Sequence, residues 1–298
     1  MTNPNRRKLN TGPFKLDRLR RLNRLRRPLE DTPALAGAPH KPRSRGIYLL
    51  PNAFTTAALF CGFYAIVMAM GGLYEPAAVA IFVAMVLDSL DGRVARLTNT
   101  QSEFGAQYDS LSDMVSFGAA PALVMYVWAL RGMGKLGWLA AFVYCAGAAL
   151  RLARFNTNIA VVDKRYFQGL PSPAAAALVA GFVFLMTDLG EQGQNWRWLA
   201  WGITLFAGLT MVTNVPFYSF KDVNFRKTVP FITVFLVVLL IVGVTYNPPI
   251  ALFGGFILYA LSGYVIFFLR WFKGDPVPLV QTAPEPEAGA SEVDERGG

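Results

Sequence analysis

The chain has 298 residues, of which 54% are hydrophobic and only 16% are charged, a composition too apolar for an ordinary soluble protein. Residues 1–45 hold 13 of the 28 Lys and Arg but only 3 of the 19 Asp and Glu, so this N-terminal arm has a net charge of +10 and the rest of the chain has a net charge of −1. This arm, with arginines among leucines, suits an anionic leaflet as an amphipathic helix, or a solvated segment that only fixes orientation. Nucleic-acid binding is the rival interpretation, and the apolar body of the chain argues against it.

Eight apolar stretches follow the arm, each close to the roughly 20 residues that a helix needs to cross a bilayer. They cover about residues 48–71, 74–97, 105–130, 135–154, 171–188, 197–216, 228–246 and 249–270. The sequence therefore predicts an all-α, polytopic membrane helix bundle with about eight transmembrane helices. The domain boundaries expected are 1–46 for a basic arm, 47–273 for the membrane domain and 274–298 for a Pro- and Glu-rich disordered tail.

Lys and Arg are concentrated in every second connection between these apolar stretches. With eight spans, one set of connections carries most of the Lys and Arg of the body, and the opposite set carries only Arg131, Lys135 and Arg197. The positive-inside rule places the basic set in the cytoplasm. The expectation is a multi-pass protein of the cell (inner) membrane with both termini in the cytoplasm.

Four aspartates at fixed spacing are the most informative feature of the chain. They form the pattern D-x2-D-G-x2-A-R-x8-G-x3-D-x3-D, which begins at Asp88 and continues through Asp91 and Asp109 to Asp113. Residues three or four apart share a helix face, so each pair points one way, and the short polar loop between the pairs lets the two faces meet. Carboxylates that converge beside hydrocarbon are costly and need cations, and hard oxygen ligands favour Mg²⁺ or Mn²⁺.

Two other interpretations of the aspartates stay open at this point. A buried ion-pair network with Arg93 and Arg96 would neutralise them, but it leaves the glycines of the pattern unexplained. A cation transporter would use intramembrane carboxylates as an ion path, although these four are expected at one membrane face rather than at the midplane. The only histidine, His40, lies in a Pro-rich linker, so general-base chemistry falls to a carboxylate.

The pattern resembles the signature of the CDP-alcohol phosphatidyltransferase family, with every fixed position filled. These integral membrane enzymes move a phosphoryl-linked group from a CDP-activated donor to an alcohol and release CMP. The resemblance implies two divalent cations, the first held by Asp88, Asp91 and Asp109 and the second by Asp88, Asp109 and Asp113. It also implies that Asp113 is the general base. The positive-inside bias puts all four aspartates at the cytoplasmic face.

A second set of residues around the motif is expected to bind the CDP-linked donor. The set comprises Asn52, Thr55, Gly92, Arg96, Ser102 and Gly105. The glycines admit close approach of a nucleotide, and an arginine offers a planar donor fork to a diphosphate. The loop serine and the Asn/Thr pair are implied by the family resemblance, while helix capping is the plainer interpretation of the Asn/Thr pair.

Two segments beyond the motif, 149–156 and 167–173, indicate the acceptor. They resemble the bacterial membrane members of the family that use L-serine with CDP-diacylglycerol. Arg151 and Arg154 share a helix face and suit the serine carboxylate or a lipid phosphate, or else they only anchor the helix end. Another alcohol such as glycerol 3-phosphate remains the alternative acceptor. The partners expected are therefore both substrates, membrane lipids and a second copy in a homodimer, as in related enzymes.

Overall fold

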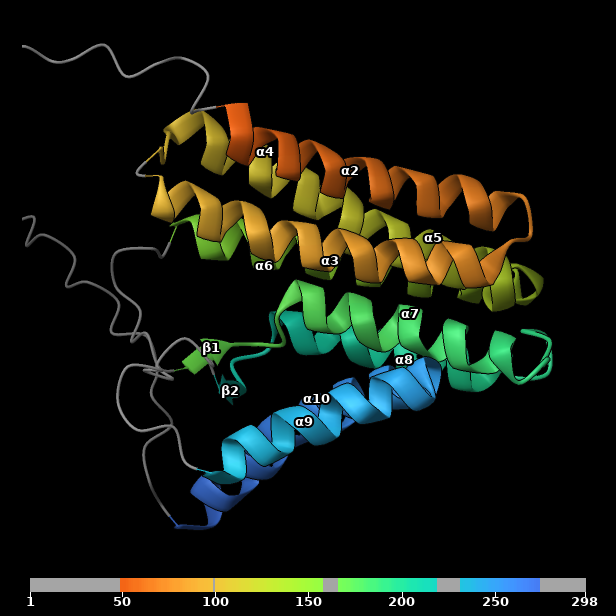
Figure 1. Cartoon of the computed structure of the whole chain (residues 1–298). Coiled ribbons are helices and arrows are strands. Elements are labelled where there is room, and N and C mark those ends of the chain that lie inside the picture. The colour runs from red at the N-terminus through yellow and green to blue at the C-terminus, as the bar shows by residue number, and fades with distance from the viewer. Residues whose placement is uncertain (1–48, 99, 158–165, 219–230, 274–298) are drawn as a thin grey trace, which may run out of the picture. The chain divides into compact units, whose positions relative to one another are not determined.

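The computed structural model describes residues 49–98, 100–157, 166–218 and 231–273. The predicted basic arm and the predicted tail lie outside these residues. The described helices are α2 (Leu49–Met70), α3 (Tyr74–Leu97), α4 (Glu103–Asp113), α5 (Ala120–Met125), α6 (Lys135–Thr157), α7 (Ser172–Asp188), α8 (Arg197–Val212), α9 (Phe231–Tyr246) and α10 (Pro248–Lys273), as Figure 1 shows. The prediction of an all-α membrane fold is confirmed.

The number of spans is corrected by the structure. Every predicted stretch contains a helix, but only four helical segments in the described part of the chain are long and apolar enough to cross a membrane. These are Leu50–Met70, Glu103–Met133, Lys135–Thr157 and Pro248–Leu269. The prediction of eight such helices is therefore wrong. The helices α7, α8 and α9 have 17, 16 and 16 residues, fewer than the roughly 20 that a span needs, and α3 carries several charges.

The second of these segments is continuous but not uniformly α-helical. After α4, π-helical turns at η2 (Met114–Ala119) and η3 (Tyr126–Leu130) alternate with α5, and the 3₁₀ turn η4 (Arg131–Met133) ends the segment. A π-helical turn shifts the register of every following side chain, and such turns occur often at functional sites. Here the first of them begins directly after Asp113.

Small residues allow the helices to pack closely. Alanines of α2 such as Ala58 and Ala65 are fully buried, and α7 is buried along nearly its whole length among α3, α8 and α10. A Cβ atom added to Gly147 of α6 would lie 2.4 Å from the carbonyl oxygen of Gly208 in α8. Close backbone approach through small residues is typical of membrane helices, where apolar burial alone drives little association.

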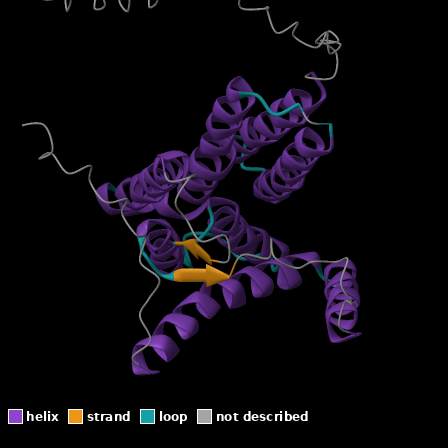
Figure 2. Ribbon diagram, turned by 90° about the vertical axis from the view of Figure 1, so that its left-hand side faces the viewer, coloured by secondary structure: helices purple, strands orange, loops and turns teal. Residues whose placement is uncertain are grey.

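A pair of short strands joins two loops that are far apart in sequence. The strands β1 (Tyr166–Gln168) and β2 (Pro216–Tyr218) lie side by side (Figure 2). They are antiparallel, with Phe167 opposite Phe217. Directly after β1, Gly169 has a φ of 76°, and its N–H donates to the carbonyl oxygen of Val215 at 2.9 Å. The pair therefore fixes the backbone that leads into the first residues of α7.

Candidate active site

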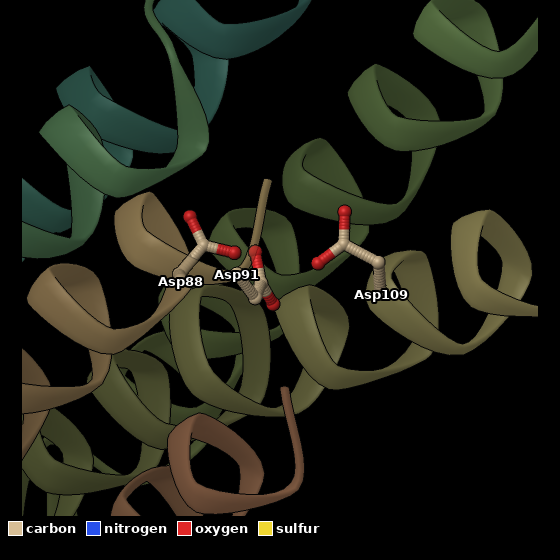
Figure 3. A group of neighbouring side chains, drawn as sticks. All are labelled: Asp88, Asp91 and Asp109. Carbon is tan, nitrogen blue, oxygen red and sulfur yellow. The ribbon is translucent and has the colours of Figure 1, made fainter. Parts of the chain in front are cut away.

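Three of the four predicted aspartates form one compact group. Asp88 and Asp91 lie near the end of α3, and Asp109 lies in α4, so the loop between the two helices brings the pairs together as predicted. One carboxylate oxygen from each of the three lies within 4.8 Å of the others. Figure 3 shows the three carboxylates turned toward a common space. Their spacing suits a shared cation.

The fourth aspartate stands one helical turn further along. Asp113 is the last residue of α4, and its carboxyl group lies within interaction range of Asp88 and Asp109 on one side and of Arg151 on the other. The structure thus brings all four predicted aspartates into one region. Three of them form the compact group, and Asp113 lies beside it.

The residues fit a divalent cation. Oδ1 of Asp109 is buried and has no hydrogen-bond partner. No salt bridge forms among the described residues, and the Nε of Arg96 donates within its own helix to the carbonyl oxygen of Gly92 at 2.9 Å. The ion-pair network considered from the sequence is therefore absent from the described part of the chain. Clustered carboxylates without a cationic side chain need external positive charge, and their oxygens are the ligands that Mg²⁺ and Mn²⁺ prefer.

Helix α2 supports this group with a threonine. The hydroxyl of Thr55 donates to Oδ2 of Asp91 at 2.7 Å, and Thr55 is only 4% exposed. The carbonyl oxygen of Thr55 in turn accepts a hydrogen bond from Ser112, the residue before Asp113, at 3.1 Å. The sequence placed Thr55 among the residues that bind the donor. The structure places its hydroxyl against a carboxylate of the cluster.

The remaining donor candidates lie in two places. Ser102 caps α4, because its Oγ accepts from the N–H of Gly105 at 3.0 Å. A Cβ atom on Gly105 would lie 3.1 Å from that oxygen and 3.5 Å from Oδ1 of Asn52, so these three residues from α2 and α4 adjoin. Gly92 and Arg96 are exposed on α3, and a Cβ atom on Gly92 would meet nothing within 4 Å. Open space beside this glycine leaves room for a ligand.

The two candidate acceptor arginines point to different partners. Nη1 of Arg151 donates to the hydroxyl of Ser172, the buried first residue of α7, at 2.7 Å. Nη1 of Arg154 donates to Oδ1 of Asn214, beyond the end of α8, at 3.1 Å. Arg151 alone lies within interaction range of Asp113. The sequence predicted that both arginines share a helix face, but it could not predict which of them lies near the aspartates.

Comparison with known proteins agrees with this arrangement. The family model described as CDP-alcohol phosphatidyltransferase matches residues 48–213. A protein of Helicobacter pylori strain J99 named CDP-diacylglycerol–serine O-phosphatidyltransferase is 35% identical over 226 residues, which is 76% of this chain and 92% of that protein. Proteins of the same name in Mycobacterium tuberculosis strain H37Rv and in Saccharomyces cerevisiae are 33% and 34% identical, over 64% and 60% of this chain and 68% and 62% of their own lengths.

Proposed function

Since the chain belongs to the CDP-alcohol phosphatidyltransferase family, we propose that it transfers the phosphatidyl group of CDP-diacylglycerol to L-serine, giving phosphatidylserine and CMP. The observation that supports this most is the aspartate group of α3 and α4, which combines three converging carboxylates with one buried, unpartnered oxygen. The relatives that carry the serine enzyme's name extend the similarity to most of the chain. The four apolar helical segments agree with a membrane enzyme.

We assign two divalent cations, Mg²⁺ or Mn²⁺, to the four aspartates. Asp88, Asp91 and Asp109 would hold one, and Asp88, Asp109 and Asp113 would hold the other. When bound, such cations neutralise the pyrophosphate of the donor and the charge of the departing CMP. The compact group of three and the neighbouring Asp113 support this division.

The donor is proposed to lie between the ends of α2, α3 and α4. Asn52, Ser102 and Gly105 adjoin one another there, and Gly92 leaves open space on α3. Among the described residues, Arg96 donates through its Nε to the carbonyl oxygen of Gly92, and its two terminal nitrogens suit a diphosphate oxygen. In this assignment Thr55 acts on Asp91 rather than on the nucleotide.

Asp113 is proposed as the general base for the acceptor. It would take the proton of the serine hydroxyl while that oxygen bonds to the phosphorus that bears diacylglycerol. The bond from this phosphorus to the oxygen of CMP then breaks, and CMP carries away the electron pair. Arg151 interacts electrostatically with Asp113, and within the described part of the chain its hydrogen bond goes to the neutral hydroxyl of Ser172. Its guanidinium would hold the carboxylate of the incoming serine.

The domain boundaries, the orientation in the membrane and the oligomeric state are proposed from the sequence. We propose that the membrane domain covers 47–273, between a basic arm (1–46) and a tail (274–298), that both termini and the aspartates face the cytoplasm, and that the enzyme is a homodimer. Arg96 near the aspartates and Arg151 and Arg154 at the end of α6 agree with that side under the positive-inside rule.

A panel of acceptors tests the reaction. With purified protein in detergent, CDP-diacylglycerol and Mn²⁺ or Mg²⁺, L-serine should release CMP far faster than glycerol 3-phosphate or inositol. A preference for glycerol 3-phosphate would reject serine as the acceptor but would leave the phosphatidyl transfer itself in place, because an arginine can also bind the phosphate of that acceptor. Absence of CMP release with every alcohol would reject the proposed function and restore the cation-transport alternative.

A further inference from the structure

Among the described threonines, Thr55 is the one whose hydroxyl donates to a carboxylate. Thr56, Thr98 and Thr204 all donate to the carbonyl oxygen four residues earlier, at 2.6 to 2.8 Å. This back-bond is the usual role of a threonine hydroxyl inside a helix. For Thr55 the corresponding distance to Pro51 is 3.2 Å, whereas the distance to Oδ2 of Asp91 is 2.7 Å. The shorter contact crosses between helices and ends on a carboxylate.

We propose that Thr55 is a positioning residue that orients Asp91 for cation binding. This inference rests on the cation site proposed above. A carboxylate on a helix rotates about its side-chain bonds, and a hydrogen bond to one oxygen fixes the direction of the remaining lone pairs. Bonds to charged acceptors are shorter and stronger than neutral ones, so a hydroxyl at 2.7 Å is well suited to this task.

Thr55 is itself held in place from the opposite side. Ser112 donates to the carbonyl oxygen of Thr55, and Ser116, one turn later, donates to that of Ala58, both at 3.1 Å. A Cβ atom on Gly62 would lie 2.6 Å from the hydroxyl oxygen of Ser116, so α2 and η2 are in close contact. The backbone that presents Thr55 to Asp91 is therefore tied to the segment that begins beside Asp113.

Binding of Mn²⁺ to the metal-free, full-length protein in detergent, measured by electron paramagnetic resonance, tests the proposal without turnover. Thr55→Val keeps the shape and removes the hydroxyl, and it should weaken Mn²⁺ binding about 10- to 100-fold, as loss of a partner behind a metal ligand usually does. Thr55→Ser should restore most of the affinity. The matched control is Thr204→Val, because Thr204 is also buried but lies in α8 and, among the described residues, donates to the carbonyl oxygen of Ala200. Its affinity should stay unchanged.

A double-variant comparison separates orientation from damage to the fold. In an Asp91→Ala background, adding Thr55→Val should cause no further loss of Mn²⁺ affinity, and a further loss would contradict the proposed route through Asp91. If Thr55→Val does not fold, Thr55→Ala replaces it in both comparisons. If a folded variant without the hydroxyl binds Mn²⁺ with unchanged affinity, the proposed role of Thr55 is rejected, while the cation site itself stands. Failure of the unmodified protein to bind Mn²⁺ would instead reject the cation site.

Discussion

Two groups beside Asp113 carry opposite charges: the aspartate cluster (Asp88, Asp91 and Asp109) and the arginine cluster (Arg151 with its partner Ser172). On one side, α3 and α4 bring together Asp88, Asp91 and Asp109, with no salt bridge to any described residue. On the other side, α6 presents Arg151, which donates a hydrogen bond to the neutral hydroxyl of Ser172. The carboxylates suit cations and the arginine suits an anion. A base between them would meet both a metal-bound phosphate and the carboxylate of an amino acid.

The two clusters are also built differently. The aspartate cluster depends on α2, α3 and α4, which follow one another in the chain and are joined by the contacts of Thr55. The arginine cluster depends on the start of α7, whose backbone is fixed by β2, almost 50 residues further along. Changes near the aspartates should therefore abolish chemistry. Changes near the arginine should mainly affect the acceptor.

The largest effect is expected from the two aspartates assigned to both cations. Asp88→Ala or Asp109→Ala should reduce CMP release to background at every Mn²⁺ or Mg²⁺ concentration, because the phosphoryl transfer relies on electrostatic stabilisation. EDTA should do the same to the unmodified enzyme, and added metal should reverse only that loss. Size-exclusion chromatography shows whether each variant is folded. Activity that survives EDTA would contradict a metal-dependent reaction.

Asp113→Asn should have the second largest effect. The amide keeps the shape of the side chain but cannot take the proton of the acceptor hydroxyl, so turnover should fall by about two to four orders of magnitude. Donor binding, measured by titration with CDP-diacylglycerol, should be retained. Near-normal turnover of the folded variant would exclude Asp113 as the base.

Arg151→Lys should produce a smaller effect that is specific to the acceptor. Lysine keeps the charge but loses the planar fork, and loss of a hydrogen bond to a charged group costs about 1.5–3 kcal/mol. The KM for serine should therefore rise roughly 10- to 100-fold while the KM for CDP-diacylglycerol changes little. Arg154→Lys is the matched comparison, since Arg154 bonds to Asn214 instead. Equal effects on the serine KM would contradict the assignment of the acceptor site to Arg151.

Much of the aspartate cluster could be predicted from the sequence because its information is local. Spacings of three and four residues set the helix faces, and a short loop joins the pairs, so convergence of Asp88, Asp91 and Asp109 followed directly. The all-α fold followed from composition and apolar length. The count of long apolar helices did not, because α7, α8 and α9 have only 17, 16 and 16 residues and α3 carries several charges.

The contacts between distant segments could not be predicted in the same way. The spacing of Arg151 and Arg154 places them on one face of a helix, yet they bond to different segments. Ser172 begins α7, and Asn214 follows the end of α8. Asn52 and Thr55 were paired by spacing, but only tertiary packing turns one toward Gly105 and the other toward Asp91. The strand pair gave no periodic signal, since each strand has only three residues.

The smallest effect on turnover is expected at the glycine that links this strand pair to α7. Gly169 has a φ of 76°, and a Cβ atom there would lie 2.3 Å from the carbonyl oxygen of Met211. Gly169→Ala should therefore move the backbone that leads to Ser172 and loosen its contact with Arg151. Gly72 is the matched control, because its φ is 77° but a Cβ atom there would meet nothing within 4 Å.

Comparing the two glycine variants distinguishes the effect of backbone strain from the effect of moving the backbone that leads to Ser172. Strain at positive φ costs about 1–2 kcal/mol at either position, so both alanine variants should lower the midpoint of thermal unfolding in detergent. Only Gly169→Ala should also raise the KM for serine, by less than about tenfold, since it leaves Arg151 itself in place. The KM for CDP-diacylglycerol should stay unchanged in both, because neither glycine lies in the donor-binding set. If Gly72→Ala raised the serine KM equally, the effect would come from general destabilisation, and the dependence of the arginine cluster on the strand pair would be refuted.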